Sequence, residues 1–214
     1  MIRLFVGTDP RQGPADEMLL RSVERNTSVN VEVTMMRHGD GEFGGWNIGR
    51  EPGKPKGGGW GTDFAAFRMA VPELCGFEGV AVYLDCDMIV LGDLRDLVAL
   101  PRAKPVLCTS QKIMDVLVID CGAFAGSGWP TIAEMRASGR TLYEYRKMLA
   151  RMDMIDPSLP PEWDCRDCAP ANAQLVHFTD VTTQPWQPWP EAVAYRDHPD
   201  ENCCRLWDEY RSRA

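Results

Sequence analysis

Two aspartates separated by a single residue follow an apolar segment in the stretch VYLDCDMIVLGDL, residues 82–94. These are Asp85 and Asp87, and a third polar side chain, His177, lies in the last apolar segment of the chain. Two carboxylates and an imidazole suit a divalent ion such as Mn²⁺, with coordination positions left for phosphate oxygens or water. Acidic pairs also occur in solvated turns, and a single histidine is more often structural, so a metal site and a solvated strand end are both open interpretations.

The beginning of the chain predicts the kind of fold that would position such residues. Residues 2–6 predict a buried strand, and a helix with Pro14 in its first turn follows until about Asn26. Residues 31–36 predict the next strand, and this order is typical of an α/β domain. We therefore expect one domain over residues 1–214, with a Rossmann-like mixed central sheet and helices on both faces.

Ligands of such sheets bind beyond the carboxyl ends of the strands. Thr8 and Asp9 occupy such a place after the first strand, as Asp85 and Asp87 do after a later one.

The prolines of PWQPWP at 185–190 exclude a helix there. The remaining predicted elements are strands at 80–84, 105–109, 115–120 and 174–178, and helices from Thr62 to near Pro72, over 130–150 with a break at Gly139, and over 204–211.

The composition limits the class of protein. The chain has 214 residues, 44% hydrophobic and 25% charged, as in ordinary soluble globular proteins. Its net charge of -8 argues against a nucleic-acid partner bound by phosphate neutralisation. No apolar run approaches the roughly 18 to 20 residues of a membrane span, and the N-terminal run is too short for a signal-peptide core. We expect a cytoplasmic protein without a membrane span.

The eight cysteines are expected to be reduced thiols because no secretion signal precedes them. Cys165 and Cys168 form a CxxC pair, and Cys203 and Cys204 are adjacent. A structural zinc site using some of these four is an open alternative, although adjacent cysteines rarely reach one metal together. The others lie in apolar contexts that predict small core residues: Cys75, Cys86, Cys108 and Cys121.

The DxD stretch resembles that of the retaining glycosyltransferases of family eight, the group of glycogenin and the bacterial lipopolysaccharide galactosyltransferases, and small bacterial members look closest. Three more segments agree in order, and the resemblance spans about residues 2–189. It implies a single-domain GT-A fold and a metal-dependent retaining transfer of a hexose from a UDP-sugar to an unknown glycan, lipid or protein acceptor. The further segments are FVGTDPRQGPADEMLLRSVERNTS, GTDFAAFRMAVPELC and LVHFTDVTTQPWQPW.

Specific roles follow from this resemblance. It implies that Asp85, Asp87 and His177 bind Mn²⁺ (or Mg²⁺), with Asp85 shared between the metal and the ribose. It also implies that Thr8 and Asp9 lie near the uracil and ribose. The implied nucleotide-sugar contacts further include Cys86, inside the DxD, and Arg68, whose planar guanidinium binds oxyanions well. The alternative for Arg68 is an ion pair on a helix surface.

One segment departs from the family pattern H-F-x-G-x-x-K-P-W, in which the lysine lies on the diphosphate. This chain reads H-F-T-D-V-T-T-Q-P-W, so Asp180 replaces the glycine and Gln184 stands before Pro-Trp. Either Thr183 and Gln184 contact phosphate as neutral groups, or another basic residue compensates. The candidates for compensation are Lys54, Lys56 and Arg68.

The nucleophile or sugar-face carboxylate is not fixed by the resemblance. Asp115 lies near a usual polar position, and Asp164 stands in LPPEWDCRD where small bacterial relatives have asparagine. We treat both, together with Arg68, as candidate catalytic residues, and Asp120 as a weaker one. Turn chemistry or a hydrogen bond at a strand end is the alternative for each aspartate.

The Gly-rich segment 38–61 predicts either a loop that closes over a ligand, which we favour, or a floppy insertion. Its Trp46 and Trp60 are candidates for the acceptor side. Trp186 and Trp189 are more simply packing residues of the proline-rich turn than stacking platforms for a sugar.

Three other classes remain open at this point. A phosphatase of the haloacid dehalogenase type also has an apolar strand running into D-x-D, with the first aspartate as nucleophile. That motif is usually near the N-terminus, whereas Asp85 follows two earlier predicted strands. The others are a nucleotidyltransferase of similar fold and a fold-retaining, inactive nucleotide-sugar binding protein.

Overall fold

The computed structural model describes residues 1–43, 62 and 64–211 of the chain. The chain divides into two compact units. The first unit comprises Met1–Pro10, Val31–Asp85 and Leu100–Leu159, and the second comprises Arg11–Asn30, Cys86–Ala99 and Pro160–Ala214. The single-domain organisation predicted from the sequence stays a prediction. Trp46, Trp60, Lys54 and Lys56 lie outside the described residues.

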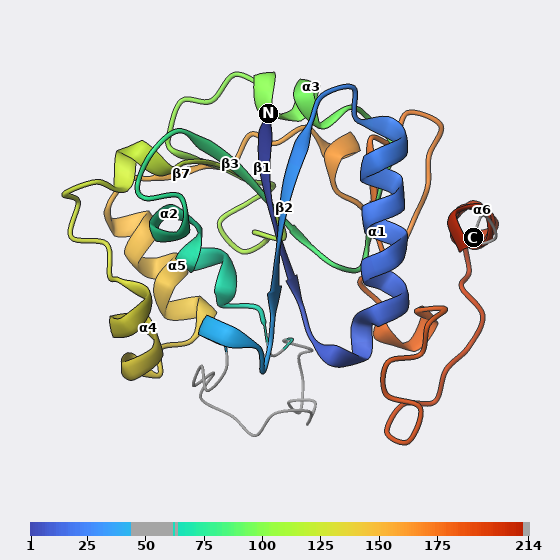
Figure 1. The fold of residues 1–214 in the computed structure, drawn as a ribbon. Helices are drawn as coiled ribbons and strands as arrows, with labels where there is room; N and C mark the ends of the chain where they lie inside the picture. Colours follow the sequence, from blue (N-terminus) through green and yellow to red (C-terminus); the bar gives the residue numbers. More distant parts are fainter. Residues whose placement is uncertain (44–61, 63, 212–214) are drawn as a thin grey trace. The chain divides into compact units, whose positions relative to one another are not determined.

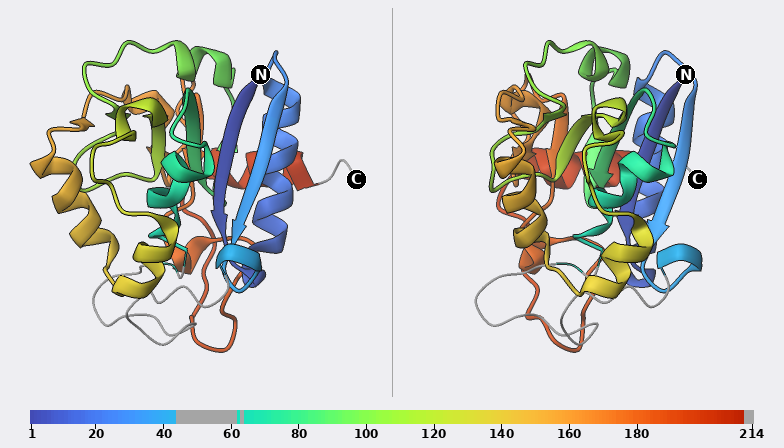
Figure 2. Two further views of the ribbon diagram at one scale, coloured as in Figure 1. Left: turned by 60° about the vertical axis from the view of Figure 1, so that its left-hand side comes forward. Right: turned by 90° about the vertical axis from the view of Figure 1, so that its left-hand side faces the viewer.

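The first unit is built on a mixed six-stranded sheet in the order β2-β1-β3-β6-β5-β7. Its central strand β1 is parallel to both β2 and β3, whereas β6 runs antiparallel to β3 and β5. Figures 1 and 2 show β1 and β2 running side by side. The predicted mixed α/β class with a central mixed sheet is confirmed. The strands are β1 (Ile2–Thr8), β2 (Val31–Arg37), β3 (Val80–Asp85), β5 (Val106–Leu107), β6 (Val116–Asp120) and β7 (Ile155–Asp156).

The apolar runs of β1, β3 and β6 form the core of this unit because both faces of these strands are buried. Strand register then fixes which polar residues meet. Gly7 of β1 pairs with Asp85 of β3, and Leu84 pairs with Val116. The carboxyl end of β3 therefore lies beside the end of β1 and the beginning of β6.

One predicted helix of the first unit is wrong in its limits. Residues 64–66 form turns, the short 3-10 helix η3 spans Phe67–Ala70, and α2 spans only Val71–Leu74. Pro72 stands in the first turn of α2 rather than at the end of a longer helix, because a residue without an amide hydrogen fits where no intrahelical partner exists.

The predicted helical region over 130–150 is confirmed with its break. It forms α4 (Ile132–Ser138) and α5 (Leu142–Arg151), which Figure 1 shows in the same part of the first unit as α2. Gly139 has a φ of 60°, the left-handed conformation in which glycine commonly ends a helix. Each helix begins with a threonine and glutamate capping box.

The second unit contains a three-stranded sheet, β4-β9-β8, together with α1 and α6. The β4 backbone is tied to α1, since the hydroxyl of Ser22 accepts a hydrogen bond from the amide of Val90 at 2.9 Å. Helix α6 begins at Glu201, earlier than predicted. Among the residues that the structure describes, no helix has the length and apolar character needed to cross a membrane. The elements are α1 (Gly13–Asn26), β4 (Met88–Val90), α3 (Leu94–Ala99), β8 (Cys165–Arg166), β9 (Leu175–His177) and α6 (Glu201–Arg211).

Candidate functional site

Asp85, the last residue of β3, is held by two side chains of the first unit. The Nη2 atom of Arg68 donates to both carboxylate oxygens, at 2.8 and 2.9 Å, and the hydroxyl of Tyr83 donates to Oδ1 at 2.7 Å. Asp115, which directly precedes β6, accepts from Nη1 of the same arginine at 2.8 Å. We call Arg68, Tyr83, Asp85 and Asp115 the arginine–aspartate cluster.

All three nitrogens of the Arg68 guanidinium donate hydrogen bonds within the first unit. Its Nε donates to the carbonyl of Ala65 at 2.8 Å, and Nη1 also donates to the carbonyl of Met114. The side chain is 2% exposed and lies over the ring of Tyr83, with 4.8 Å between the guanidinium carbon and the ring centroid. This geometry contradicts the alternative of an ion pair on a helix surface, because η3 buries the arginine against two strands.

The charge of Arg68 is secured by its neighbours. Burial alone would lower the pKa of the guanidinium, but the charges of Asp85 and Asp115, together with Tyr83, outweigh burial and raise it. The cluster is therefore a buried cation between two carboxylates, and a single nitrogen of the guanidinium contacts both oxygens of Asp85.

The close packing above Tyr83 explains the glycine of β1. A Cβ at Gly7 would lie 2.0 Å from the hydroxyl of Tyr83 and 2.8 Å from the ring of Phe64. Any larger residue would displace the hydroxyl that bonds Asp85. The next residues, Thr8 and Asp9, are fully buried at the end of the same strand, and their proposed contacts with uracil and ribose stay predictions.

A second arginine of the first unit was missed from the sequence. Arg146 lies on α5, and its Nε is buried without a hydrogen-bond partner in the described part of the chain. Burial and the charge of Arg68 lower the pKa of Arg146, and the charges of Asp115 and Asp85 oppose this. The amphipathic pattern of α5 did not distinguish this arginine from the other polar residues of the helix.

A second group of polar side chains lies in the second unit. His177 Nδ1 lies 3.2 Å from Oδ1 of Asp164, whose side chain is fully buried, and His177 Nε2 lies 3.2 Å from Oδ1 of Asp87. The amide Nε2 of Gln184 donates to Oδ2 of Asp87 at 3.2 Å and to the carbonyl of Phe178 at 2.7 Å. We call Asp87, Asp164, His177 and Gln184 the histidine–aspartate cluster.

Strand pairing brings this cluster together. Met88 of β4 pairs with His177 of β9, and the amide of Phe178 donates to the carbonyl of Asp87 at 2.9 Å. Asp164 directly precedes β8, which pairs in parallel with β9. Asp87 and Asp164 therefore directly precede the two strands, β4 and β8, that flank the strand of His177.

The cluster keeps acceptor atoms that the protein does not satisfy. Although Asp87 Oδ1 is close to His177 Nε2, it is buried and has no hydrogen-bond partner among the described residues, and the same holds for Gln184 Oε1. A carboxylate bonded to Nδ1 of a histidine fixes the ring so that Nε2 can offer its lone pair to a cation. These atoms fit a small cation at Asp87 and His177, with Asp164 orienting the imidazole.

The altered segment after His177 is folded by its own polar residues. Asp180 accepts from the amide and hydroxyl of Thr182 at 3.0 and 2.7 Å and begins the short 3-10 helix η6 (Val181–Thr183). The hydroxyl of Thr183 donates to the carbonyl of Asp180 at 3.0 Å.

In the first unit, Asp120 accepts a hydrogen bond from the amide of Gly122 at 3.1 Å, which is the turn chemistry expected as its alternative role.

The cysteines form no candidate metal centre within the described ranges, since no group of three ligand atoms there includes a thiol. Cys86 is buried between the two aspartates of the DxD sequence. Burial raises the pKa of Cys165 to about 11 and that of Cys203 to about 12, so both are protonated thiols at neutral pH.

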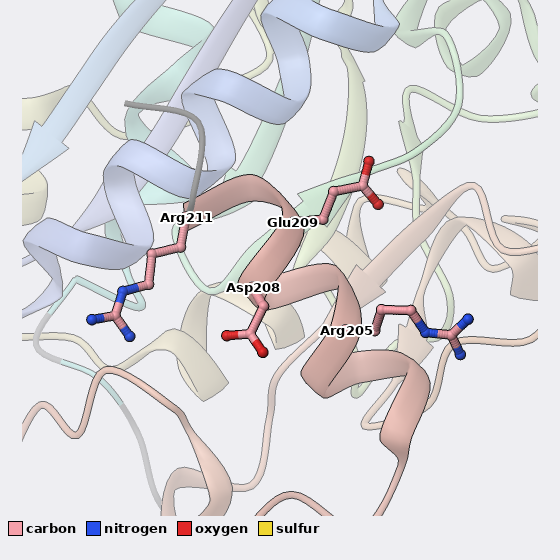
Figure 3. A pocket seen from close by; sticks show the side chains of 4 residues that line it. All are labelled: Arg205, Asp208, Glu209 and Arg211. Atoms are coloured by element: carbon pink, nitrogen blue, oxygen red, sulfur yellow. The ribbon is translucent and has the colours of Figure 1, made fainter.

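Two further regions of the second unit have structural or unassigned roles. Trp186 donates to Gln12 Oε1 at 2.7 Å and packs against Phe178 and Trp207, and Arg11 lies over the ring of Trp189. A surface hollow beside α6 is lined by charged side chains that point in different directions rather than converging (Figure 3), so we assign no ligand to it. Its lining residues are Arg205, Asp208, Glu209 and Arg211.

The fold is the GT-A fold of glycosyltransferases, as comparison with solved structures shows. The bifunctional glycosyltransferase WbbM superposes with a TM-score of 0.65 at 11% identity, covering 100% of this chain and 50% of WbbM. GlyE from Streptococcus pneumoniae gives 0.60 at 18% identity, covering 98% of this chain and 60% of GlyE. The galactosyltransferase LgtC, solved with donor and acceptor sugar analogs, gives 0.64 at 13% identity and covers 99% of this chain and 95% of LgtC.

The sequence comparisons are narrower. No family model matches the chain. Protein CDI from Arabidopsis thaliana is 33% identical over 112 residues, which are 51% of this chain and 40% of that protein. The chain thus spans well under two thirds of this relative, and its similarity stops short of an assignment to family eight.

Proposed function

We propose that this chain is a metal-dependent glycosyltransferase that moves a hexose from a UDP-sugar to an acceptor, with retention at the anomeric carbon. The GT-A fold and the resemblance of the DxD stretch to family eight support the class of reaction. LgtC, of the same fold, is described with donor and acceptor sugar analogs, which supports a nucleotide sugar and a glycan, lipid or protein acceptor here.

The histidine–aspartate cluster carries this proposal. Asp87 Oδ1 is buried without a hydrogen bond from the described residues, 3.2 Å from a histidine nitrogen whose ring is fixed by Asp164. A cation resolves this arrangement, because carboxylate and imidazole are ligands that Mn²⁺ and Mg²⁺ accept. We propose Asp87 and His177 as ligands, with Asp85, two positions earlier in the chain, as the third.

A divalent cation bound there supplies charge neutralisation for a leaving diphosphate. The protein residues supply position. Asp164 holds the imidazole of His177, so its geometry supports an orienting role, and its predicted role on the sugar face stays a prediction. Arg68 fixes Asp85 and Asp115, because its N–H groups are bonded to carboxylates and backbone carbonyls rather than directed at a ligand.

The same contacts of Asp85 weigh against the phosphatase alternative. An aspartate that attacks phosphorus needs an oxygen free to form the new bond. Both oxygens of Asp85 accept hydrogen bonds from Arg68, and Oδ1 accepts another from Tyr83.

The proposal is tested by hydrolysis of a panel of nucleotide sugars in the presence of Mn²⁺, which detects transfer to water without a known acceptor. Asp87→Asn and His177→Ala should abolish turnover, and Mn²⁺ with UDP should raise the Tm of the wild-type protein because both bind only the folded state.

The matched control is Asp96→Asn, which changes an exposed aspartate of the same unit on α3. It should leave turnover and the UDP-induced Tm shift unchanged. Turnover that survives both Asp87→Asn and His177→Ala would refute the metal site, and a Tm insensitive to every nucleoside diphosphate would refute the function.

A further inference from the structure

Gln184 is one of the most constrained polar residues of the second unit. It is 4% exposed, and its Nε2 bridges two acceptors, Asp87 Oδ2 at 3.2 Å and the carbonyl of Phe178 at 2.7 Å. Both N–H groups of the amide are thus used within the protein. The opposite orientation of the amide would set its oxygen against two acceptors, so the contacts also fix which end of the amide is which.

The hydrogen bond from Gln184 makes the environments of the two carboxylate oxygens of Asp87 different. Oδ2 is tied to Gln184, whereas Oδ1 is left buried beside His177 Nε2 without a hydrogen bond from the described part of the protein. Gln184 Oε1 is a second buried acceptor of this kind. A buried acceptor left without a donor is unfavourable, which indicates that a cation or its water satisfies these two atoms.

We propose that Gln184 is a positioning residue of the metal site: its Nε2 holds the carboxylate of Asp87 so that Oδ1 faces the cation, and its Oε1 accepts a hydrogen bond from a water bound to the cation. This inference rests on the proposed metal-dependent function. It differs from the expectation that Gln184 would contact phosphate, because the amide N–H groups that would do so are already bonded.

Charge gives the proposal a second consequence. A lysine at this position would place an ammonium beside Asp87 and compete with a divalent cation for the same carboxylate. The neutral amide instead positions Asp87 and leaves its full charge available. In this chain the position before Pro-Trp therefore favours cation binding at Asp87 rather than direct neutralisation of a phosphate.

The test is a titration of the full chain with Mn²⁺. Binding is measured as the loss of the electron paramagnetic resonance signal of free Mn²⁺, and this measurement needs neither a sugar nor turnover. Gln184→Leu, which keeps the size but removes both amide functions, should weaken Mn²⁺ binding by about 10- to 100-fold. Gln184→Lys should weaken it at least as much. Gln184→Met serves as a second variant if the leucine variant does not fold.

The matched control is Gln174→Leu, a glutamine of the same unit whose Nε2 donates to the backbone carbonyl of Asn172 at 3.3 Å. It should bind Mn²⁺ as the wild type does. Equal Mn²⁺ affinity of the wild type and a folded Gln184→Leu or Gln184→Met protein would overturn this inference while leaving the proposed function intact. A wild-type protein that binds no Mn²⁺ would instead overturn the metal site and the inference with it.

Discussion

The arginine–aspartate cluster and the histidine–aspartate cluster both bury carboxylates, but they balance the charge differently. In the first, Arg68 donates to Asp85 and Asp115 and keeps a raised pKa. In the second, Oδ2 of Asp87 accepts a hydrogen bond from the amide of Gln184, and Oδ1 lies beside a histidine nitrogen without a hydrogen bond from the residues that the structure describes.

Two aspartates that are neighbours in a short motif therefore have opposite environments. Asp85 ends β3, a central strand of its sheet, and is neutralised by Arg68. Asp87 directly precedes β4, an edge strand of the three-stranded sheet, and is positioned by the neutral amide of Gln184. A buried ion pair that is already complete contributes mainly to the fold, and an incomplete one indicates a ligand. The comparison predicts that substitutions in the first cluster change stability and those in the second change cation binding.

The largest effect is expected for Arg68→Leu. Removing the guanidinium strands the carboxylates of Asp85 and Asp115 in a buried environment, which should lower the free energy of unfolding by about 3–5 kcal/mol. Urea denaturation measures this change. Adding Asp85→Asn to Arg68→Leu should recover part of the loss, because one stranded charge is removed. A loss below about 1 kcal/mol for Arg68→Leu would contradict the structural role of the first cluster.

Asp164→Asn should mainly weaken cation binding, whereas Arg68→Leu should mainly lower stability. The amide keeps the volume of the carboxylate but binds His177 Nδ1 less well, so the imidazole is held less firmly for a cation. We expect Mn²⁺ affinity to fall by about 10- to 100-fold, measured by titration of the free-ion signal, with a smaller change in urea stability than Arg68→Leu causes. An Asp164→Asn protein with unchanged Mn²⁺ affinity would show that Asp164 does not orient His177 for a cation.

The sequence predicted the positions of the acidic residues better than their partners. The apolar runs placed Asp85 at the end of a strand, as the structure has it. The resemblance to family eight implies a shared metal for Asp87 and His177, whose side chains lie 3.2 Å apart in the second unit; their role as ligands stays a prediction. The resemblance to family eight implies a donor contact for Arg68, a role that suits a guanidinium. Its burial depends on Asp115, which is 47 residues away, and on a 3-10 segment where a longer helix was predicted.

The partner of Gln184 in the histidine–aspartate cluster could not be predicted from the sequence either. Its place before Pro-Trp was visible in the sequence, but its partner Asp87 is 97 residues distant. Only the pairing of β4 with β9 brings the two together. Local patterns predict elements, whereas the choice between a ligand contact and a protein contact is made by tertiary packing.

Tyr83→Phe sharpens the comparison inside the first cluster. It removes the hydroxyl that donates to Asp85 at 2.7 Å, but both donations from Arg68 remain. The free energy of unfolding should therefore fall by about 1.5–3 kcal/mol, the usual range for a hydrogen bond to a charged group and below the effect of Arg68→Leu. A loss as large as that of Arg68→Leu would show that the tyrosine, rather than the arginine, secures Asp85.

Arg146→Met should have the smallest effect on stability, although it also removes an arginine of the first unit. Burial and the charge of Arg68 lower the pKa of Arg146, and its buried Nε lacks a partner in the described chain, so the fold gains little from this charge. We expect the free energy of unfolding to stay within about 0.5 kcal/mol of the wild type or to rise. If Arg146 instead serves a phosphate, UDP affinity should fall by about 10- to 100-fold, the usual range for one charge-assisted hydrogen bond. Isothermal titration with UDP and urea denaturation separate the two effects. A variant that loses stability like Arg68→Leu would place Arg146 in the first cluster, and the contrast between a neutralised and an open carboxylate would then involve two arginines rather than one.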